Sequence, residues 1–309
     1  MNEKRASRKR PKRRLLKITI AVMVVLIAGI GLYVFSIYGN AKDTVNEKMH
    51  EPVDSIDRNT TQKKMEASEP LNILLLGVDE RKYDSGRSDA LMVLSLNPKD
   101  DSMQLVSIPR DTRTTIVGKG FEDKINHAYA FGGSDMSVAT VENFLNIELD
   151  HYVRMNMEGL KELVDKLGTI TVDNEIAWND GKYDFNTGPV EMDGDKTMAY
   201  VRMRKQDPDG DFGRTERQRK VIQGIIERGA SVGSVTKIND YIDVLGSNMT
   251  TNMDFDDMKK LFNGYRSTRK NIASYQMKGS GTNIDGTYYL MVPDEEVAKV
   301  HGMISKEKS

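Results

Sequence analysis

The longest apolar segment of the sequence begins at Ile18 and ends at Tyr38, and its 21 residues include no charged side chain. As an α-helix it would be about 31 Å long, close to the roughly 30 Å hydrocarbon thickness of a bilayer. A buried core helix is usually shorter and has a polar face, and a cleaved signal peptide has a shorter apolar region before its cleavage site. The segment therefore predicts a single N-terminal transmembrane helix.

The charges on the two sides of this segment are very unequal. Residues 1–17 contain nine Lys or Arg and one acid, whereas residues 18–309 contain 36 basic and 45 acidic residues, a net charge of −9. Because basic residues flank the cytoplasmic end of membrane helices, 1–17 is predicted to be a cytoplasmic tail and 39–309 extracellular, in a single-pass type II arrangement at the cell membrane. A basic run is also typical of nucleic-acid arms. Seventeen residues before a membrane span are too few for a DNA-binding fold, so we predict no nucleic-acid partner.

The remainder of the chain divides into a polar connection and a folded domain. Residues 39–69 are polar and lack a hydrophobic period, which predicts an extracellular stalk, and the domain is expected to cover 70–309. The sequence has no cysteine, which excludes disulfides and thiolate chemistry, and its four histidines lack metal-ligand spacing.

Alternating strand and helix patterns predict an α/β domain with a mixed sheet. Residues 71–76 form a nearly continuous apolar run that ends at Gly77, as in a strand buried on both faces. A strand–helix–strand unit over 152–172 favours a parallel strand pair. Further strands are expected at 91–96, 104–108, 272–277 and 288–292, and helices at 134–146, 157–167, 196–202, 215–228, 255–266 and from 294.

Two acidic residues follow or precede these strands at one predicted edge of the sheet. Asp79 comes after the first strand, and Asp89 lies ten residues later, directly before the second. Ligand sites of open α/β sheets lie at the carboxyl ends of strands, and two carboxylates suit a hard cation such as Mg²⁺. The alternative is that both aspartates only form turns or are solvated charges.

Arginines are concentrated in two other segments. Arg110 directly follows the strand at 104–108, where the alternative is an exposed Arg–Asp pair. The stretch from 200 to 220 contains Arg202, Arg204, Lys205, Arg214, Arg217, Arg219 and Lys220. Arginine matches phosphate oxygens with a planar fork of donors, and the helical period places Arg214, Arg217 and Gln218 together near a helix N-terminus. The alternative is a solvated helical face paired with nearby acids.

At these segments the sequence resembles the LytR-CpsA-Psr family of cell-wall glycopolymer transferases. The resemblance is carried by GVDER (77–81), GRSDALMV (86–93), SIPRDT (107–112), KINHAYAFGG (124–133) and YVRMRKQDPDGDFGRTERQ (200–218). It covers the chain from residue 71 to the C-terminus. One departure is LGTI (167–170), where relatives often have a second glycine.

The resemblance implies a three-layer α/β/α sandwich with a hydrophobic pocket for a polyprenyl tail and a pyrophosphate site at its mouth. Carried over by motif, the metal ligands for Mg²⁺ would be Asp79 and Asp89, and the phosphate contacts would be Arg87, Arg110, Arg202, Arg204, Arg214 and Gln218. Asp79, Asp89, Arg87 and Arg110 would be the catalytic residues. An oxygen of Asp79 or Asp89 that does not bind the metal is the candidate base.

The reaction implied is a phosphoryl transfer at the surface of a Gram-positive cell. A hydroxyl of peptidoglycan N-acetylmuramic acid attacks the sugar-side phosphorus of an undecaprenyl-pyrophosphate-linked glycopolymer, wall teichoic acid or a related anionic polymer, and undecaprenyl phosphate leaves. Positioned arginines and a metal supply the charge neutralisation that such a reaction needs. The alternatives are hydrolysis of the same pyrophosphate, a wall-polymer-binding protein without turnover, and a regulatory protein.

Overall fold

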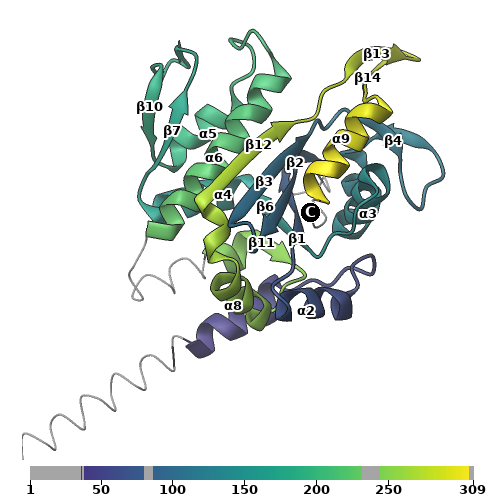
Figure 1. Cartoon of the computed structure of the whole chain (residues 1–309). Coiled ribbons are helices and arrows are strands. Elements are labelled where there is room, and N and C mark those ends of the chain that lie inside the picture. Colours follow the sequence, from purple (N-terminus) through teal and green to yellow (C-terminus); the bar gives the residue numbers. More distant parts are fainter. Residues whose placement is uncertain (1–35, 37, 80–85, 232–243, 306–309) are drawn as a thin grey trace, which may run out of the picture.

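The structure is a computed structural model that describes residues 36, 38–79, 86–231 and 244–305 (Figure 1). The helices are η1 (Val45–Met49), α2 (Arg58–Glu66), α3 (His127–Leu145), α4 (Met157–Leu167), α5 (Gly194–Arg202), α6 (Asp211–Ser231), α8 (Phe255–Gly264), η3 (Arg266–Lys270) and α9 (Asp294–Ile304). The predicted transmembrane segment, 18–38, lies almost wholly outside the described residues. Within the described ranges, no helix has both the length and the apolar character needed to cross a bilayer.

A six-stranded mixed sheet forms the centre of the molecule, as the sequence predicts. Its strands, in spatial order, are β11 (Met249–Thr251), β6 (His151–Asn156), β1 (Leu71–Val78), β2 (Ser88–Asn97), β3 (Ser102–Ile108) and β12 (Asn271–Gln276). β1 is parallel to β6 and β3 is parallel to β12, whereas β2 is antiparallel to both β1 and β3. The carboxyl end of β1 therefore meets the amino end of β2 and the carboxyl end of β3 at one edge of the sheet.

Apolar side chains fill both faces of the sheet. In β1, Leu74 and Leu76 face a core shared with α3 and α9, while Leu71 and Ile73 face a second core that includes residues of α6 and α8. This alternation explains the nearly continuous apolar run, because a central strand must be apolar on both sides. Figure 1 accordingly shows helices on both faces of the sheet.

The predicted parallel pairing of the strands around α4 is wrong. β6 lies in the central sheet, but β7 (Ile170–Asn174) pairs antiparallel with β10 (Gly188–Met192) in a separate two-stranded sheet. β7 alternates buried and exposed residues, whereas a strand inside a parallel sheet is buried on both faces. With α4, α5 and α6, this small sheet encloses a core of its own around Trp178 and Phe185.

Short strands complete the fold, and the sequence pattern predicted few of them. They are β4 (Arg113–Thr115), β5 (Glu122–Lys124), β8 (Trp178–Asn179), β9 (Asp184–Phe185), β13 (Ser280–Ile284) and β14 (Thr287–Met291). α3 begins seven residues before the predicted helix and is kinked at Gly132 and Gly133, where Gly133 has φ 64°. Few residues other than glycine tolerate this conformation. The predicted start at residue 134 matches the part of α3 that follows the kink.

The segment predicted to be a stalk is packed against the domain. Six of its apolar side chains are at most 9% exposed, namely those of Ala41, Val45, Met49, Val53, Ile56 and Met65. His50 forms a parallel bridge with Thr251 of β11. The folded unit therefore begins well before residue 70. The polar composition conceals this packing because only six apolar residues, each surrounded by polar ones, carry it.

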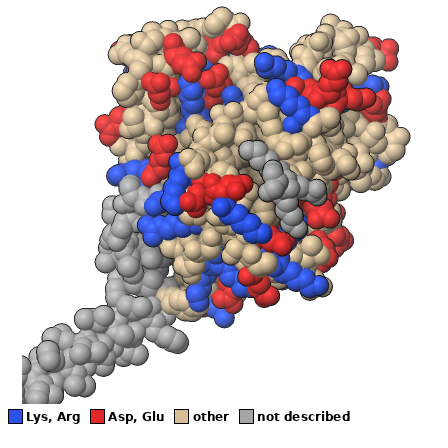
Figure 2. Space-filling view, in the orientation of Figure 1, with Lys and Arg blue, Asp and Glu red and all other residues tan. Residues whose placement is uncertain are grey.

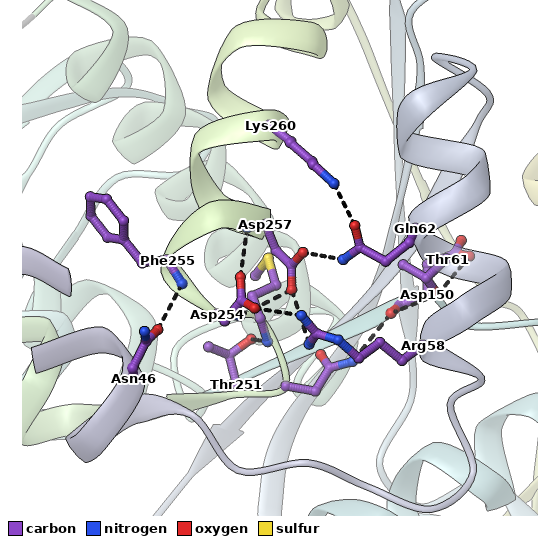
Figure 3. Close-up of polar contacts among 12 residues, drawn as sticks. Asn46, Arg58, Thr61, Gln62, Asp150, Thr251, Asp254, Phe255, Asp257 and Lys260 are labelled. Carbon is purple, nitrogen blue, oxygen red and sulfur yellow. Dashed lines mark hydrogen bonds and ion pairs between the residues drawn. The ribbon is translucent and has the colours of Figure 1, made fainter. Parts of the chain in front are cut away.

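Ion pairs between α2 and α8 hold this segment in place (Figure 3). The Arg58 guanidinium contacts Asp254 and lies 3.2 Å from the Asp257 carboxylate, which is almost fully buried. Gln62 donates to the same Asp257 carboxylate and accepts a hydrogen bond from Lys260. Asp254 and Asp257 also form the capping box at the start of α8. The orientation of α8 is thereby tied to the N-terminal segment.

A buried histidine beside this cluster predicts a pH dependence of stability. Burial lowers the pKa of His151, in spite of the carboxylates of Asp257 and Asp150 nearby. Above about pH 6.5 the His151 imidazole is neutral in both the folded and the unfolded chain. Below that pH it takes up a proton more readily in the unfolded chain than in the folded one. The contribution of His151 to the free energy of unfolding is therefore expected to decrease as pH falls, by at most about 1.4 kcal/mol per pH unit.

Urea unfolding of the protein and of His151→Gln between pH 7.5 and pH 5.5 measures this contribution. The loss of stability on acidification is expected to be smaller in the variant, because Gln does not titrate. Parallel stability curves for the two proteins would contradict the assignment.

Candidate functional site

The two predicted acidic residues lie at adjoining strand ends. The Asp79 N–H donates to the Arg87 carbonyl at 3.5 Å, directly after β1 and before β2. The strand register shifts here, since Gly77 pairs with Ala90 but Val78 pairs with Ser88, so Asp89 is the extra residue of a β-bulge. Bulges redirect side chains at functional edges of sheets. The structure thus brings Asp79 and Asp89 to one edge of the sheet, as the sequence predicts.

Arg110 links this edge to the rest of the site. Its Nη1 donates to Asp89 Oδ1 at 2.6 Å, and its Nε lies 3.7 Å from Asp111 Oδ2 and 3.8 Å from Asp211 Oδ2. Burial alone would lower the pKa of Arg110, but the Asp211 and Asp89 carboxylates outweigh it and raise the pKa. Lys124 in turn holds Asp111 at 2.7 Å. Arg110 is therefore fixed among three carboxylates, charged and only partly exposed.

The N-terminal turn of α6 adds further arginines. Arg214 Nη2 lies 2.7 Å from Asp211 Oδ1, and Arg204 Nε lies 3.8 Å from the same oxygen. The Arg214 side chain is 14% exposed, its Nε has no hydrogen-bond partner in the structure, and burial lowers its pKa. Buried donors without a partner are rare, and each needs an explanation such as an absent ligand. Arg110, Arg204 and Arg214, all predicted site residues, thus meet around Asp211.

Two other predicted residues are more exposed. Arg87 precedes β2 and Arg202 is the last residue of α5, and both have exposed side chains. Neither makes an ion pair with another residue of the described ranges. The structure does not bring these two into the Arg110 cluster.

Arg217 has a structural role. The prediction that it lies beside Arg214 in the site is therefore wrong. Its side chain is 5% exposed, its Nε donates to the Tyr200 carbonyl at 3.1 Å, and its Nη2 donates to the Met203 carbonyl at 2.5 Å. Its Nη1 forms an ion pair with Asp207. All these partners belong to α5 or to the α5–α6 loop, so Arg217 holds that loop in place instead of facing the cluster.

A mostly apolar pocket lies near the arginines. It has a volume of about 120 Å³ between the sheet and the helices α4, α5 and α6. Its lining is Leu75, Leu76, Gly77, Ala90, Met92, Val153, Met155, Asn156, Met157, Leu160, Val201, Gln218, Val221 and Ile222. Gln218 lies one helical turn after Arg214, and its buried Oε1 has no hydrogen-bond partner in the structure. The apolar pocket therefore adjoins the arginine cluster at Gln218.

Several residues of the site were not predicted. Asp211 contacts three arginines, and Asp111 and Lys124 continue the network, although none of the three was among the predicted site residues. Asp211 lies in the first turn of α6, where an acid is favourable at the positive end of the helix dipole. An acidic residue at this helix position was the sequence feature that could have indicated a role for Asp211.

Within the described ranges, no group of three or more acidic, histidine or cysteine side chains has the geometry to hold a metal ion. The predicted donor set for a cation at this edge is the pair of carboxylates of Asp79 and Asp89. Arg110 Nη1 donates to one oxygen of Asp89, Oδ1. Two carboxylates without nitrogen or sulfur ligands suit a cation that takes further oxygen ligands from a bound phosphate.

Known proteins resemble this chain over most of its length. A polyisoprenyl-teichoic acid–peptidoglycan teichoic acid transferase TagU of Bacillus anthracis is 47% identical over 285 residues, 92% of this chain and 94% of that protein. The crystal structure of Bacillus subtilis TagU superposes with a TM-score of 0.64 at 40% identity, over 78% of this chain and 98% of that one. A structure of TagT bound to LIIa-WTA superposes with a TM-score of 0.67 at 29% identity, over 84% of this chain and 96% of that one.

The family assignment rests on the family model as well as on these relatives. The model of the LytR_cpsA_psr family matches residues 33–306, which include nearly all the described elements and every residue of the site. The match also begins before the strand β1, in agreement with the packed N-terminal segment. The chain belongs to the LytR_cpsA_psr family.

Proposed function

We propose that the protein transfers a glycopolymer phosphate, wall teichoic acid or a related anionic polymer, from undecaprenyl pyrophosphate to a hydroxyl of peptidoglycan N-acetylmuramic acid. The observation that carries the proposal is the junction at Gln218, where an apolar pocket adjoins the helical turn of the mostly buried Arg214. The lipid chain of a polyprenyl pyrophosphate needs an apolar environment and its phosphates need positive charge, within a few ångströms of each other. The names of the TagU relatives, and the TagT structure with LIIa-WTA, support the same substrate classes.

In this proposal the pocket receives the first part of the polyprenyl chain. A pocket of about 120 Å³ is smaller than a whole polyprenyl chain, so the rest of the lipid lies outside it in this proposal. Arg110, Arg204 and Arg214 bind the pyrophosphate oxygens, and Arg87 and Arg202 contact the phosphates from the exposed side. Guanidinium forks favour such oxygens because two parallel hydrogen bonds add to the charge attraction.

The reaction is a single displacement at phosphorus. The acceptor hydroxyl oxygen forms a bond to the sugar-side phosphorus, the bridging P–O bond breaks, and undecaprenyl phosphate leaves with the bridging oxygen. The hydroxyl proton passes to a carboxylate oxygen of Asp79 or Asp89. The arginines stabilise the charge on the leaving phosphate, and they are already oriented by Asp211 and Asp89 before the substrate arrives.

A Mg²⁺ ion held by Asp79 and Asp89 would neutralise charge on the two phosphates. The bulge at Asp89 and the chain reversal between β1 and β2 bring these two residues together. The protein would be anchored by the helix predicted at 18–38, with the domain outside the cell membrane of a Gram-positive bacterium. This location would give the site access to both the lipid carrier and peptidoglycan.

Transfer is tested with the full-length protein in proteoliposomes that contain a polyprenyl-pyrophosphate-linked glycopolymer. With peptidoglycan oligomers and Mg²⁺, we expect a covalent polymer–peptidoglycan product and release of polyprenyl phosphate that depends on the acceptor. Equal release without peptidoglycan would identify a hydrolase. Lipid binding without any release would identify a polymer-binding protein and refute the proposal.

Replacing Asp89 by Asn is expected to weaken the dependence on metal. The Mg²⁺ concentration for half-maximal transfer should rise by more than about 10-fold, because even changes outside the ligand shell cost about 10–100-fold in metal affinity. The matched control is Asp123→Asn, since Asp123 pairs with His127 and lies outside the cluster. An Asp89→Asn protein with an unchanged Mg²⁺ titration would rule out Asp89 as a ligand.

A further inference from the structure

The outer face of α8 is unusual for a surface helix. Phe255 and Phe262 are seven residues apart, so they lie on the same side of the helix, with Met258 and Lys259 between them. We call these four residues the α8 outer face. Asp257 lies on the opposite side and is almost fully buried. None of the four residues is acidic, although α8 has two exposed or partly exposed acids elsewhere, Asp254 and Asp256.

The C-terminal end of this face, at Phe262, is both apolar and basic. Phe262 is 68% exposed, the largest exposed fraction among the large hydrophobic residues of the described ranges. The guanidinium of Arg266 lies 5.9 Å from its ring centroid. Lys259 and Arg266 are exposed, and η3 adds Arg269 and Lys270. In Figure 2, Lys and Arg side chains are interspersed with Asp and Glu side chains over the face of the domain that is in view.

The first residue of this face, Phe255, contacts the N-terminal segment. Tyr38 packs edge-on against Phe255, with ring centroids 5.0 Å apart, and the Phe255 N–H donates to Asn46 Oδ1 at 3.0 Å. In Figure 3 the Phe255 ring points away from the Arg58 cluster that fixes α8 to α2. Tyr38 is the last residue of the apolar segment 18–38. The α8 outer face therefore starts where the predicted membrane span ends.

We propose that the α8 outer face, with Arg266, rests on the membrane surface and binds anionic lipid headgroups. Aromatic rings prefer the boundary between hydrocarbon and headgroups, and basic side chains are attracted to anionic lipids. Phe262 lies about 10 Å along the helix axis from Phe255, so one face spans the distance from the anchor to the basic residues of η3. The absence of an acid on the face favours lipid over a protein surface of mixed charge.

This contact would give the domain a second attachment beside the single anchor. One transmembrane helix alone lets a domain rotate and tilt, whereas two adjoining contacts fix its orientation. The Arg58 pairs with Asp254 and Asp257 make α8 and the N-terminal segment move together. The inference rests on the proposed membrane anchor, but it does not require transferase activity.

The chain has no cysteine, so a single reporter can be placed in the full-length protein. Phe262→Cys, labelled with a polarity-sensitive fluorophore, is reconstituted in vesicles of phosphatidylcholine with phosphatidylglycerol. We expect blue-shifted emission, quenching by lipid-borne quenchers and protection from iodide. Phe121→Cys is the control, because Phe121 is 47% exposed and precedes β5, away from α8. Its label should remain accessible to iodide.

Two comparisons separate the anchor from the surface contact. Flotation with the vesicles reports the anchor, so a floating protein whose label at 262 is as accessible to iodide as the label at 121 would overturn the inference. Charge reversal by Lys259→Glu with Arg266→Glu should abolish the protection without affecting flotation. Protection only in native membranes, and not in pure lipid vesicles, would point to a protein partner and would also overturn it.

Discussion

Replacing Arg217 by Met is expected to lower the free energy of unfolding by about 3–5 kcal/mol, the usual cost of removing one partner of a buried ion pair. Met fills much of the same volume but leaves the Asp207 carboxylate, which is 4% exposed, without its counter-charge. The carbonyls of Tyr200 and Met203 also lose their donors. Urea unfolding monitored by circular dichroism measures the change.

The matched control for this prediction is Arg214→Met, one turn earlier on α6. Arg214 pairs with Asp211, which keeps its ion pairs with Arg110 and Arg204 when Arg214 is removed, so this loss is expected to cost less stability than Arg217→Met. If the two variants were equally stable, Arg217 would not hold the α5–α6 loop. If Arg217→Met loses transfer and regains it on cooling, the result would agree with a structural role. Cooling would restore the folded loop on which catalysis depends.

These two arginines illustrate what the sequence leaves undetermined in the site. The helical period predicts that Arg214 and Arg217 lie together near the start of α6, but the two side chains have different partners. It does not reveal that the α5–α6 loop folds back over Arg217 and offers two carbonyls and a carboxylate, whereas Arg214 points toward Arg110 and Asp89. A difference of three residues along a helix is enough to separate a structural arginine from a candidate ligand contact. Only the path of the loop decides between them.

The central sheet was predictable because its strands are buried on both faces. The run over 71–76 and the turn at 97–101 define three consecutive strands whose order the structure confirms. The pairing of strands that do not follow one another in the chain was harder to predict. The strand–helix–strand order around α4 favoured a parallel pair, yet β7 pairs with β10. The packing of the N-terminal segment was missed because its few buried apolar residues stand among many charged and polar ones.

The junction between the pocket and the arginines had no sequence signal of its own. Pocket-lining residues such as Val221 and Ile222 have the same apolar character as core residues, and Gln218 looks like an ordinary polar helical residue. Its importance comes from position, because α6 carries Arg214 on one turn and the pocket lining on the next. The arginine motif around it was nevertheless sufficient to predict the kind of ligand.

Replacing Arg214 by Met is expected to reduce transfer by about 10²–10³-fold in kcat while the protein remains folded, the usual cost of removing one donor from a site that stabilises developing negative charge. The guanidinium Nε has no hydrogen-bond partner in the structure, and burial lowers the pKa of Arg214, so this side chain bears an energetic cost that a bound phosphate would relieve. The measurement is the single-turnover rate of polymer–peptidoglycan formation at saturating lipid substrate.

Two further variants distinguish a phosphate contact from a general effect of charge. Arg214→Lys keeps the charge but loses the planar fork, so its rate should lie between those of Met and Arg. Lys220→Met removes a positive charge two turns along α6, where Lys220 pairs with Glu175, and should leave the rate within a few-fold of the original. Equal losses in Lys220→Met and Arg214→Met would mean that the helix acts only through its overall field. A loss confined to Arg214, partly restored by Lys, requires that this guanidinium touches the reacting phosphate.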